Sequence, residues 1–148
     1  MERVSRSIRE RRVFVDSSAF LAVVASDDDF HQQALITIRR CARERHSLLT
    51  TRYVIVETYA GLIGAVGTRE ARAFLRNGLE EIAVEPVSDA DFKRAEMIVF
   101  QFEDKDYSYC DAISFAVMER LHLSLAYAFD THFRQHGFST PFDRQDWP

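Results

Sequence analysis

The chain has 148 residues and a mass of 17.1 kDa, which predicts a single domain over residues 1–148, since domains commonly hold about 100–150 residues. Hydrophobic residues make up 47% and charged residues 28% of the chain, the balance of a soluble globular protein. The longest stretch without a charge, residues 58–68, is shorter than the roughly 20 residues that span a bilayer. We therefore expect no membrane partner.

The charge is unevenly distributed along the chain. The net charge is −4, from 23 acidic and 19 basic residues, yet residues 1–12 hold five arginines and two glutamates. Residues 1–11 are expected to form an Arg-rich, solvated lead-in to an acidic domain. A protein that binds nucleic acid by bulk charge is basic. A nucleic-acid function would therefore require something that offsets the negative charge of this domain where the phosphates approach.

The two cysteines predict a reducing compartment. Cys41 and Cys110 form no CxxC pattern, so neither a zinc site nor a disulfide framework is expected. Two buried free thiols are typical of a cytoplasmic protein. The Arg-rich start also lacks the apolar run of a secretory signal, and a cytoplasmic location is therefore expected.

The first part of the chain alternates short strands with helices. Residues 13–15 are a β-rich run that ends at Asp16. Residues 29–32 are typical of an N-terminal capping box, which opens a helix with apolar residues at the helical period. Residues 47–50 are a second strand candidate. Residues 52–65 predict another helix, which carries an apolar stripe on one face at Val56, Tyr59, Ala60 and Ile63.

The pattern continues in the second part. Residues 68–77 predict a helix that stops at Gly78, and residues 82–84 predict a strand closed by a proline. Ser88 and Ser108 each precede an apolar-periodic run and are predicted helix caps. The remaining strand candidates are residues 123–129 and residues 138–142.

Alternating strands and helices predict an α/β layered domain around a mostly parallel sheet, with helices on both faces. The working site of such a sheet lies at the carboxyl ends of its strands. Asp16 and Asp130 each follow an apolar run that ends there. An acid in that position is costly to bury unless something pairs with it, so these two residues are the first functional candidates.

Glu57 and Asp111 are further candidates. Glu57 is the only charged residue within residues 53–68, so it either lies at a helix edge or faces a site. Asp111 follows Ser108 by three residues and either completes a capping box or serves a site. Asp16 has the same two readings, because aspartate is also a common helix cap.

Four carboxylates at one site would repel each other strongly unless a cation were bound. Oxygen ligands without His or Cys favour Mg²⁺ or Mn²⁺ over zinc. Such an ion activates water and neutralises charge on a phosphate, which suits hydrolysis of a phosphodiester bond. A bound metal would also reconcile an acidic domain with a nucleic-acid substrate.

The four acids stand in short motifs whose order and spacing are more specific than any one of them: Asp16-Ser17-Ser18-Ala19, Val56-Glu57-Thr58, Cys110-Asp111-Ala112-Ile113 and Phe129-Asp130-Thr131-His132-Phe133. Together they resemble the PIN-domain ribonucleases, and most of all the VapC-like toxins of toxin–antitoxin pairs. The resemblance spans about residues 12–142 of the chain. It implies a three-layer α/β/α domain with a central, mostly parallel five-stranded sheet.

The resemblance also implies an activity. A Mg²⁺- or Mn²⁺-dependent endoribonuclease would hydrolyse RNA phosphodiester bonds through a metal-activated water held by Asp16, Glu57, Asp111 and Asp130. Ser18 matches a small hydroxyl residue of the family. With Thr131 and His132 it is a candidate for substrate contact or for support of the acids. A homodimer and a cognate antitoxin protein are the implied partners.

Three other classes of protein are considered. A non-catalytic RNA- or protein-binding module on the same fold would be marked by erosion of the acidic set, and all four acids are present. Phospho-acceptor receivers need a lysine near a late strand, whereas no lysine follows Lys105. Haloacid-dehalogenase-like phosphatases need a second aspartate where this chain has Ser18. Receivers and phosphatases are therefore disfavoured.

Overall fold

The computed structural model describes residues 12–141 and residue 147. Its four strands form one parallel sheet in the order β3-β2-β1-β4. Phe14 in the middle of the sheet pairs with Leu49 on one side and with Ala126 on the other. The strands are β1 (Arg12–Val15), β2 (Ser47–Thr51), β3 (Ile82–Glu85) and β4 (Leu125–Tyr127).

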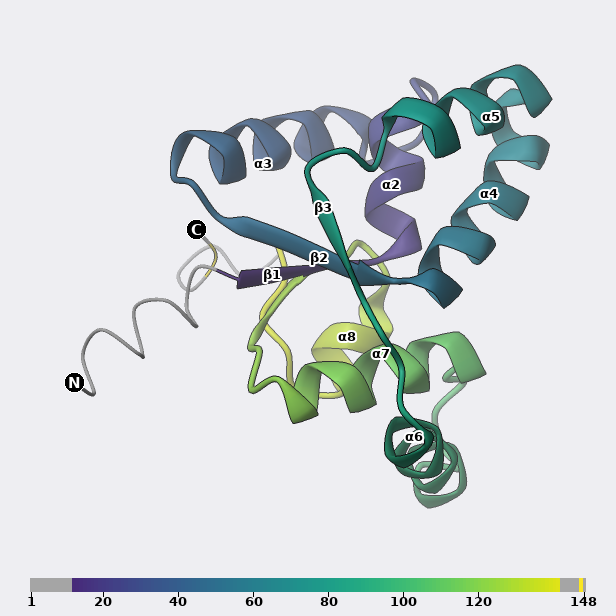
Figure 1. Cartoon of the computed structure of the whole chain (residues 1–148), viewed down its shortest axis with the longest axis vertical. Helices are drawn as coiled ribbons and strands as arrows, with labels where there is room; N and C mark the ends of the chain where they lie inside the picture. The colour runs from purple at the N-terminus through teal and green to yellow at the C-terminus, as the bar shows by residue number, and fades with distance from the viewer. Residues whose placement is uncertain (1–11, 142–146, 148) are drawn as a thin grey trace.

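Helices cover both faces of the sheet, as Figure 1 shows. One layer holds α2 (Ser17–Val24), α3 (His31–Arg43), α4 (Arg52–Val66) and α5 (Thr68–Asn77); the other holds α6 (Asp89–Gln101), α7 (Tyr109–Arg120) and α8 (Thr131–Gln135). Burial on both sides explains why β1 is an uninterrupted apolar run with Val13, Phe14 and Val15 all buried. The three-layer α/β arrangement predicted from the sequence is therefore confirmed.

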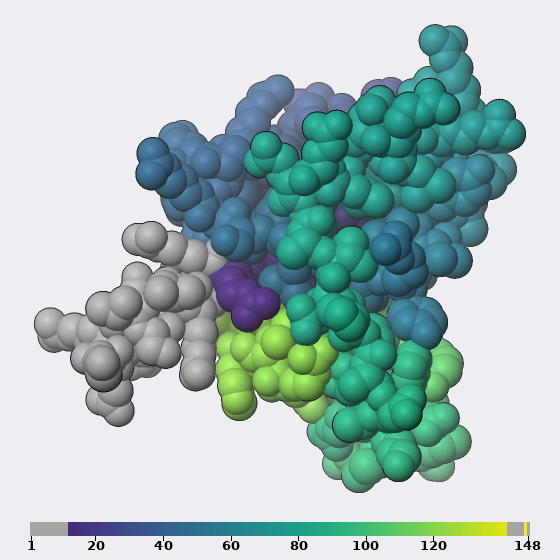
Figure 2. Space-filling model, in the orientation of Figure 1, coloured from purple at the N-terminus to yellow at the C-terminus, as the bar shows by residue number. Residues whose placement is uncertain are grey.

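The outer strand β3 is less protected than β1. None of its four residues is fully buried, and Figure 2 shows teal side chains from this part of the chain across the front surface. Glu85 ends the strand with a charge, a feature that discourages pairing of an edge strand with another chain. Among the described residues, no helix is both long enough and apolar enough to cross a membrane.

The predicted fifth strand is wrong in the described part of the chain. Only an isolated parallel bridge joins Ser139 to Leu125, and residue 142 lies outside the described residues. The predicted strand over 123–129 is also shorter in the structure. Its end leaves the sheet because the backbone N–H of Phe129 donates to the Ser18 hydroxyl, 3.0 Å away, instead of to a neighbouring strand.

The start of α3 differs from the predicted capping box at residues 29–32. The helix begins at His31 without a side-chain cap. Instead, the carboxylate of Asp28 accepts the backbone N–H of Phe30 at 2.8 Å. The Phe30 ring stacks on the Phe129 ring with centroids 5.0 Å apart, and this contact fixes the chain where it enters the helix.

Helix α4 turns its predicted apolar stripe outward. Val56 is 63% exposed and Ile63 is 43% exposed, while the buried face uses Val54 and Leu62. Apolar residues surround most of this helix, so its periodicity did not distinguish the inner face from the outer one. Cys110, predicted to be buried, is only partly buried, whereas Cys41 is buried as expected.

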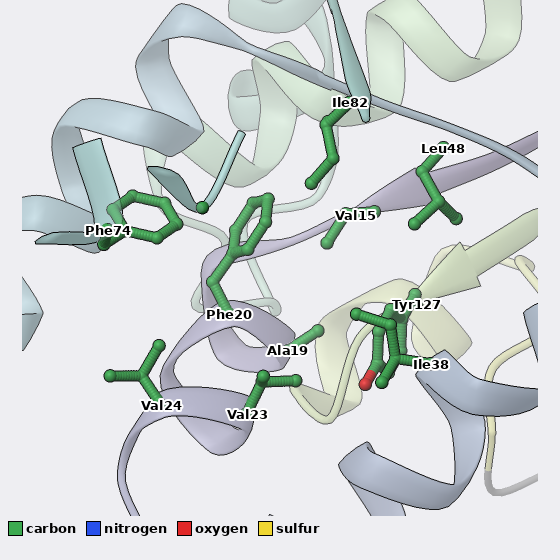
Figure 3. A pocket seen from close by; sticks show the side chains of 11 residues that line it. Val15, Ala19, Phe20, Val23, Val24, Ile38, Leu48, Phe74, Ile82 and Tyr127 are labelled. Atoms are coloured by element: carbon green, nitrogen blue, oxygen red, sulfur yellow. The ribbon is translucent and has the colours of Figure 1, made fainter. Parts of the chain in front are cut away.

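An apolar cavity of about 100 Å³ lies between the sheet and one helical layer. Figure 3 shows Phe20 of α2, Ile38 of α3 and Phe74 of α5 around it, with Val15 and Tyr127 contributed by the sheet. Cavities lined in this way stay dry, because a water molecule inside would find no polar partners. The packing under α2 is therefore incomplete.

Arg120 connects the end of α7 to the start of α6 and to β3 through two ion pairs. Its guanidinium donates to the buried Asp91 carboxylate at 2.9 Å and to Glu85 at 3.1 Å. Burial alone would raise the pKa of Asp91, but the hydrogen bonds from Arg120 and Ser88 outweigh it and lower that pKa. The helix cap predicted at Ser88 is also present, as a capping box with Asp91.

We expect Arg120→Met to destabilise the fold by about 1–3 kcal/mol, because it leaves the Asp91 carboxylate buried without its cation. Urea unfolding at pH 7 measures this loss. The matched control is Arg72→Met, since Arg72 is an exposed arginine of α5. Equal stability of the two variants would contradict the role given to Arg120.

Candidate active site

Asp16 and Asp130 lie at adjoining strand ends. Val15 of β1 pairs with Tyr127 of β4, and the Asp16 backbone N–H continues the ladder by donating to the Tyr127 carbonyl at 3.1 Å. Each aspartate then caps the helix that follows. The Asp16 carboxylate accepts the Ser18 N–H at 3.1 Å, and the Asp130 carboxylate accepts the N–H of His132 at 2.9 Å. Capping thus fixes the direction of both carboxylates.

Asp111 enters the same region from α7. Its Oδ2 accepts the Ser108 N–H at 3.1 Å, and its own N–H donates to the Ser108 hydroxyl at 3.0 Å. The capping box considered from the sequence is therefore present. The same Oδ2 also lies 2.9 Å from His132 Nδ1. The cap and the candidate site share one side chain, so the two readings of Asp111 are compatible.

In two buried acids, Asp16 and Asp111, the capping hydrogen bonds use only one of the two carboxylate oxygens. Asp16 is 2% exposed and Asp111 is 5% exposed. Their hydrogen bonds from described residues all go to Oδ2. The hydrogen bonds that orient these two carboxylates therefore leave Oδ1 of each without a donor from residues 12–141.

Ser18 holds the two strand ends together. Its hydroxyl donates to Asp16 Oδ2 at 2.6 Å and accepts the backbone N–H groups of Phe129 at 3.0 Å and Asp130 at 3.3 Å. These contacts make Ser18 a support of the acids. Thr131 is exposed at the first turn of α8 and lines a shallow recess with Arg134 and Gln135.

His132 lies between two of the acids. Its Nδ1 is 2.9 Å from Asp111 Oδ2 and 3.3 Å from Asp130 Oδ1. Burial disfavours the charged imidazolium, but the hydrogen bond to Asp111 and the charges of Asp130 and Asp111 outweigh burial and raise the pKa of His132. The ring of Tyr107 contacts the imidazole edge-on, with centroids 5.4 Å apart. Sequence reasoning missed Tyr107, since nothing in its spacing sets it apart from other core aromatics.

Glu57 approaches from α4 and is more exposed than the other three acids. Its charge acts on both Asp16 and Cys110, and it helps to raise the pKa of each. Glu57 is not part of the tightest group, in which one ligand atom each of Asp111, Asp130 and His132 lie within 4.8 Å of one another. The structure thus assembles three of the predicted site residues closely and places Asp16 and Glu57 within electrostatic range.

The electrostatics of Asp16 fit a cation site. Burial is the main cause that raises its pKa, to about 7; the Ser18 hydrogen bonds lower it, and the charges of Asp111 and Glu57 raise it further. None of these main causes is a lysine or an arginine. An ionised Asp16 is therefore uncompensated, and a divalent ion held by carboxylate oxygens would supply the missing charge.

The chain belongs to the PIN domain family, which it matches over residues 13–139. It is 34% identical over 128 residues to the 23S rRNA-specific endonuclease VapC20 of two Mycobacterium tuberculosis strains, CDC 1551 / Oshkosh and ATCC 25618 / H37Rv, a match that covers 85% of this chain and 95% of the relative. The crystal structure of M. tuberculosis VapC20, described as a sarcin–ricin loop cleaving toxin, superposes with a TM-score of 0.76 at 29% identity, covering 86% of this chain and 96% of that one. The resemblance to VapC-like PIN proteins is thereby confirmed, and the receiver and phosphatase alternatives fall away.

Replacing Asp16 should stabilise the metal-free protein at alkaline pH. A pKa raised from 3.8 to about 7 means that ionisation costs stability as the pH rises from about 4 through 7, and none below that range. Asp16→Asn removes the charge and retains a capping side chain. In EDTA we expect the Asp16→Asn variant to exceed the wild type in unfolding free energy by about 2–4 kcal/mol at pH 8, measured by urea unfolding.

The difference in unfolding free energy between Asp16→Asn and the wild type should become smaller as the pH is lowered from 8 to 4.5. Asp29→Asn, at an exposed acid beside α3, is the control and should show no such trend. A stability gain for Asp16→Asn that stays constant across this pH range would contradict the raised pKa of Asp16.

Proposed function

We propose that this protein is a divalent-metal-dependent endoribonuclease and the toxin of a toxin–antitoxin pair. One observation carries the proposal: Asp111 and Asp130 gather with His132 near the carboxyl ends of β1 and β4, and the charges of Asp111 and Glu57 act on the buried Asp16 beside them. Membership of the PIN family and a relative named as an RNA endonuclease support the same activity.

In this proposal, Asp16, Glu57, Asp111 and Asp130 hold Mg²⁺ or Mn²⁺, which would neutralise phosphate charge and lower the pKa of water. Oδ1 of Asp16 or of Asp111 orients the attacking water or accepts its proton, because the hydrogen bonds that position these two buried side chains go to Oδ2. Ser18 keeps the Asp16 carboxylate aimed at the site through its 2.6 Å hydrogen bond.

The relative's name points to a substrate class. VapC20 is named for 23S rRNA and for the sarcin–ricin loop, and we propose that this protein also cleaves a looped segment of ribosomal RNA. Recognition of such a loop depends on its shape and on unstacked bases more than on duplex sequence. Thr131, an exposed residue that directly follows Asp130 at the start of α8, is the donor we propose for contact with such a loop.

Two protein partners belong to the proposal. An antitoxin would block the site by placing an arginine against the acids, since a guanidinium pairs bidentately with a carboxylate. A second copy of the chain would cover exposed apolar side chains of α4 and α6. These are Val56, Ile63, Met97 and Phe100.

Asp16→Asn and Asp111→Asn should each slow RNA cleavage at least about a hundredfold while the fold is kept, because each removes a charge and little volume. Gel analysis of 23S rRNA incubated with pure protein and Mg²⁺ or Mn²⁺ measures the effect. Asp29→Asn is the matched control. Undiminished cleavage by Asp16→Asn, or full activity in excess EDTA, would sink the mechanism.

A growth assay tests the toxin role. Expression of the wild type in its own host should slow growth, and co-expression of a small adjacent gene should restore it, because the antitoxin then occupies the acidic site. Asp16→Asn should leave growth normal. If wild type and Asp16→Asn are equally harmless, the toxin role fails and a non-catalytic binding module becomes the better account.

A further inference from the structure

The sequence predicts a metal site made only of carboxylates, but the structure adds a nitrogen. His132 Nδ1 faces both Asp111 and Asp130, at 2.9 and 3.3 Å from their nearest oxygens. One ligand atom each of these three side chains lie within 4.8 Å of one another. No other group of three His, Cys, Asp or Glu side chains in the described residues meets this spacing.

These separations match the edges of a coordination octahedron. Ions that bond at roughly 2.1 Å hold neighbouring ligand atoms about 3.0 Å apart. The two distances from His132 Nδ1 bracket that value. An ion could therefore take the place of the proton between the imidazole and the carboxylates with little movement of the side chains.

The imidazole is also held in place. The His132 backbone N–H is fixed by Asp130 at 2.9 Å, and the Tyr107 ring contacts the edge of the imidazole. The side chain is 23% exposed, so it remains within reach of an ion from solution. A ligand that is oriented in advance binds metal with less loss of conformational freedom.

We propose that His132 is a nitrogen ligand of the divalent ion bound at Asp111 and Asp130, and that the site therefore prefers Mn²⁺ to Mg²⁺. Imidazole nitrogen suits first-row transition ions, whereas Mg²⁺ prefers oxygen ligands throughout. The inference rests on the metal dependence proposed above and chooses between the two ions that the carboxylates alone leave open. It does not depend on which RNA is cleaved.

The test is electron paramagnetic resonance of the full-length protein with Mn²⁺. Titration of the free-ion signal gives the affinity for Mn²⁺, and competition with Mg²⁺ gives the affinity for Mg²⁺. Electron spin echo modulation then reports whether a ¹⁴N nucleus is bonded to the ion. The variants are His132→Gln and, as a matched control, His122→Asn, since His122 is an exposed histidine at φ 55°, a conformation that asparagine tolerates.

The wild type and His122→Asn should show the ¹⁴N modulation and bind Mn²⁺ more tightly than Mg²⁺. His132→Gln should lose the modulation and about tenfold in Mn²⁺ affinity, with a much smaller change for Mg²⁺. Urea unfolding of His132→Gln shows whether the fold persists, and retained Mg²⁺ binding shows whether the carboxylates remain in place.

Other outcomes separate the two proposals. Tight Mn²⁺ binding without ¹⁴N modulation, or modulation that persists in His132→Gln, overturns the role of His132 and leaves the metal-dependent nuclease standing. If the wild type binds neither ion and Asp111→Asn changes nothing, the metal dependence itself fails, and the inference fails with it.

Discussion

The hydroxyl of Ser18 is the contact on which the geometry of the site depends. It donates to the Asp16 carboxylate and accepts two backbone N–H groups from the end of β4. One oxygen atom therefore joins the residue after β1, helix α2 and the turn that carries Asp130. Because buried polar groups are costly when unpaired, the two N–H groups and the carboxylate hold each other in register. The spacing of the acids follows from that register.

Much of the arrangement could be predicted from local chemistry. The end of β1 before Asp16, the stop at Gly78 and the cap at Ser108 all depend on residues within a few positions of each other. The residues that failed prediction depend on distant contacts. The exposed stripe of α4 at Val56 is decided by tertiary packing, and the short β4 by the hydroxyl of Ser18, more than a hundred positions away.

The candidate site shows the same division. The four acids could be chosen by their positions after strands or within apolar helices, and His132 by its place two residues after Asp130. The contact of His132 with Asp111 could not be predicted, because it depends on how α7 meets the turn after β4. Asp111 and Asp130 repel each other as bare carboxylates, and Nδ1 of the His132 imidazole lies 2.9 Å from an oxygen of the first and 3.3 Å from an oxygen of the second. The site therefore contains an imidazole nitrogen in addition to the carboxylates by which the sequence identified it.

Three of the four acids stabilise the fold as helix caps, whatever chemistry they also perform. Asp16, Asp111 and Asp130 each contribute to the cap of a helix. A lost cap costs about 1 kcal/mol, but asparagine or serine caps a helix about as well as aspartate, so capping alone does not require a charge at these positions. Glu57 stands in the middle of α4 and caps nothing. In a set of related chains, any capping residue at the three aspartate positions would be compatible with a stable fold. Carboxylates kept at all three, together with a glutamate that caps nothing, would indicate that the charge itself is needed.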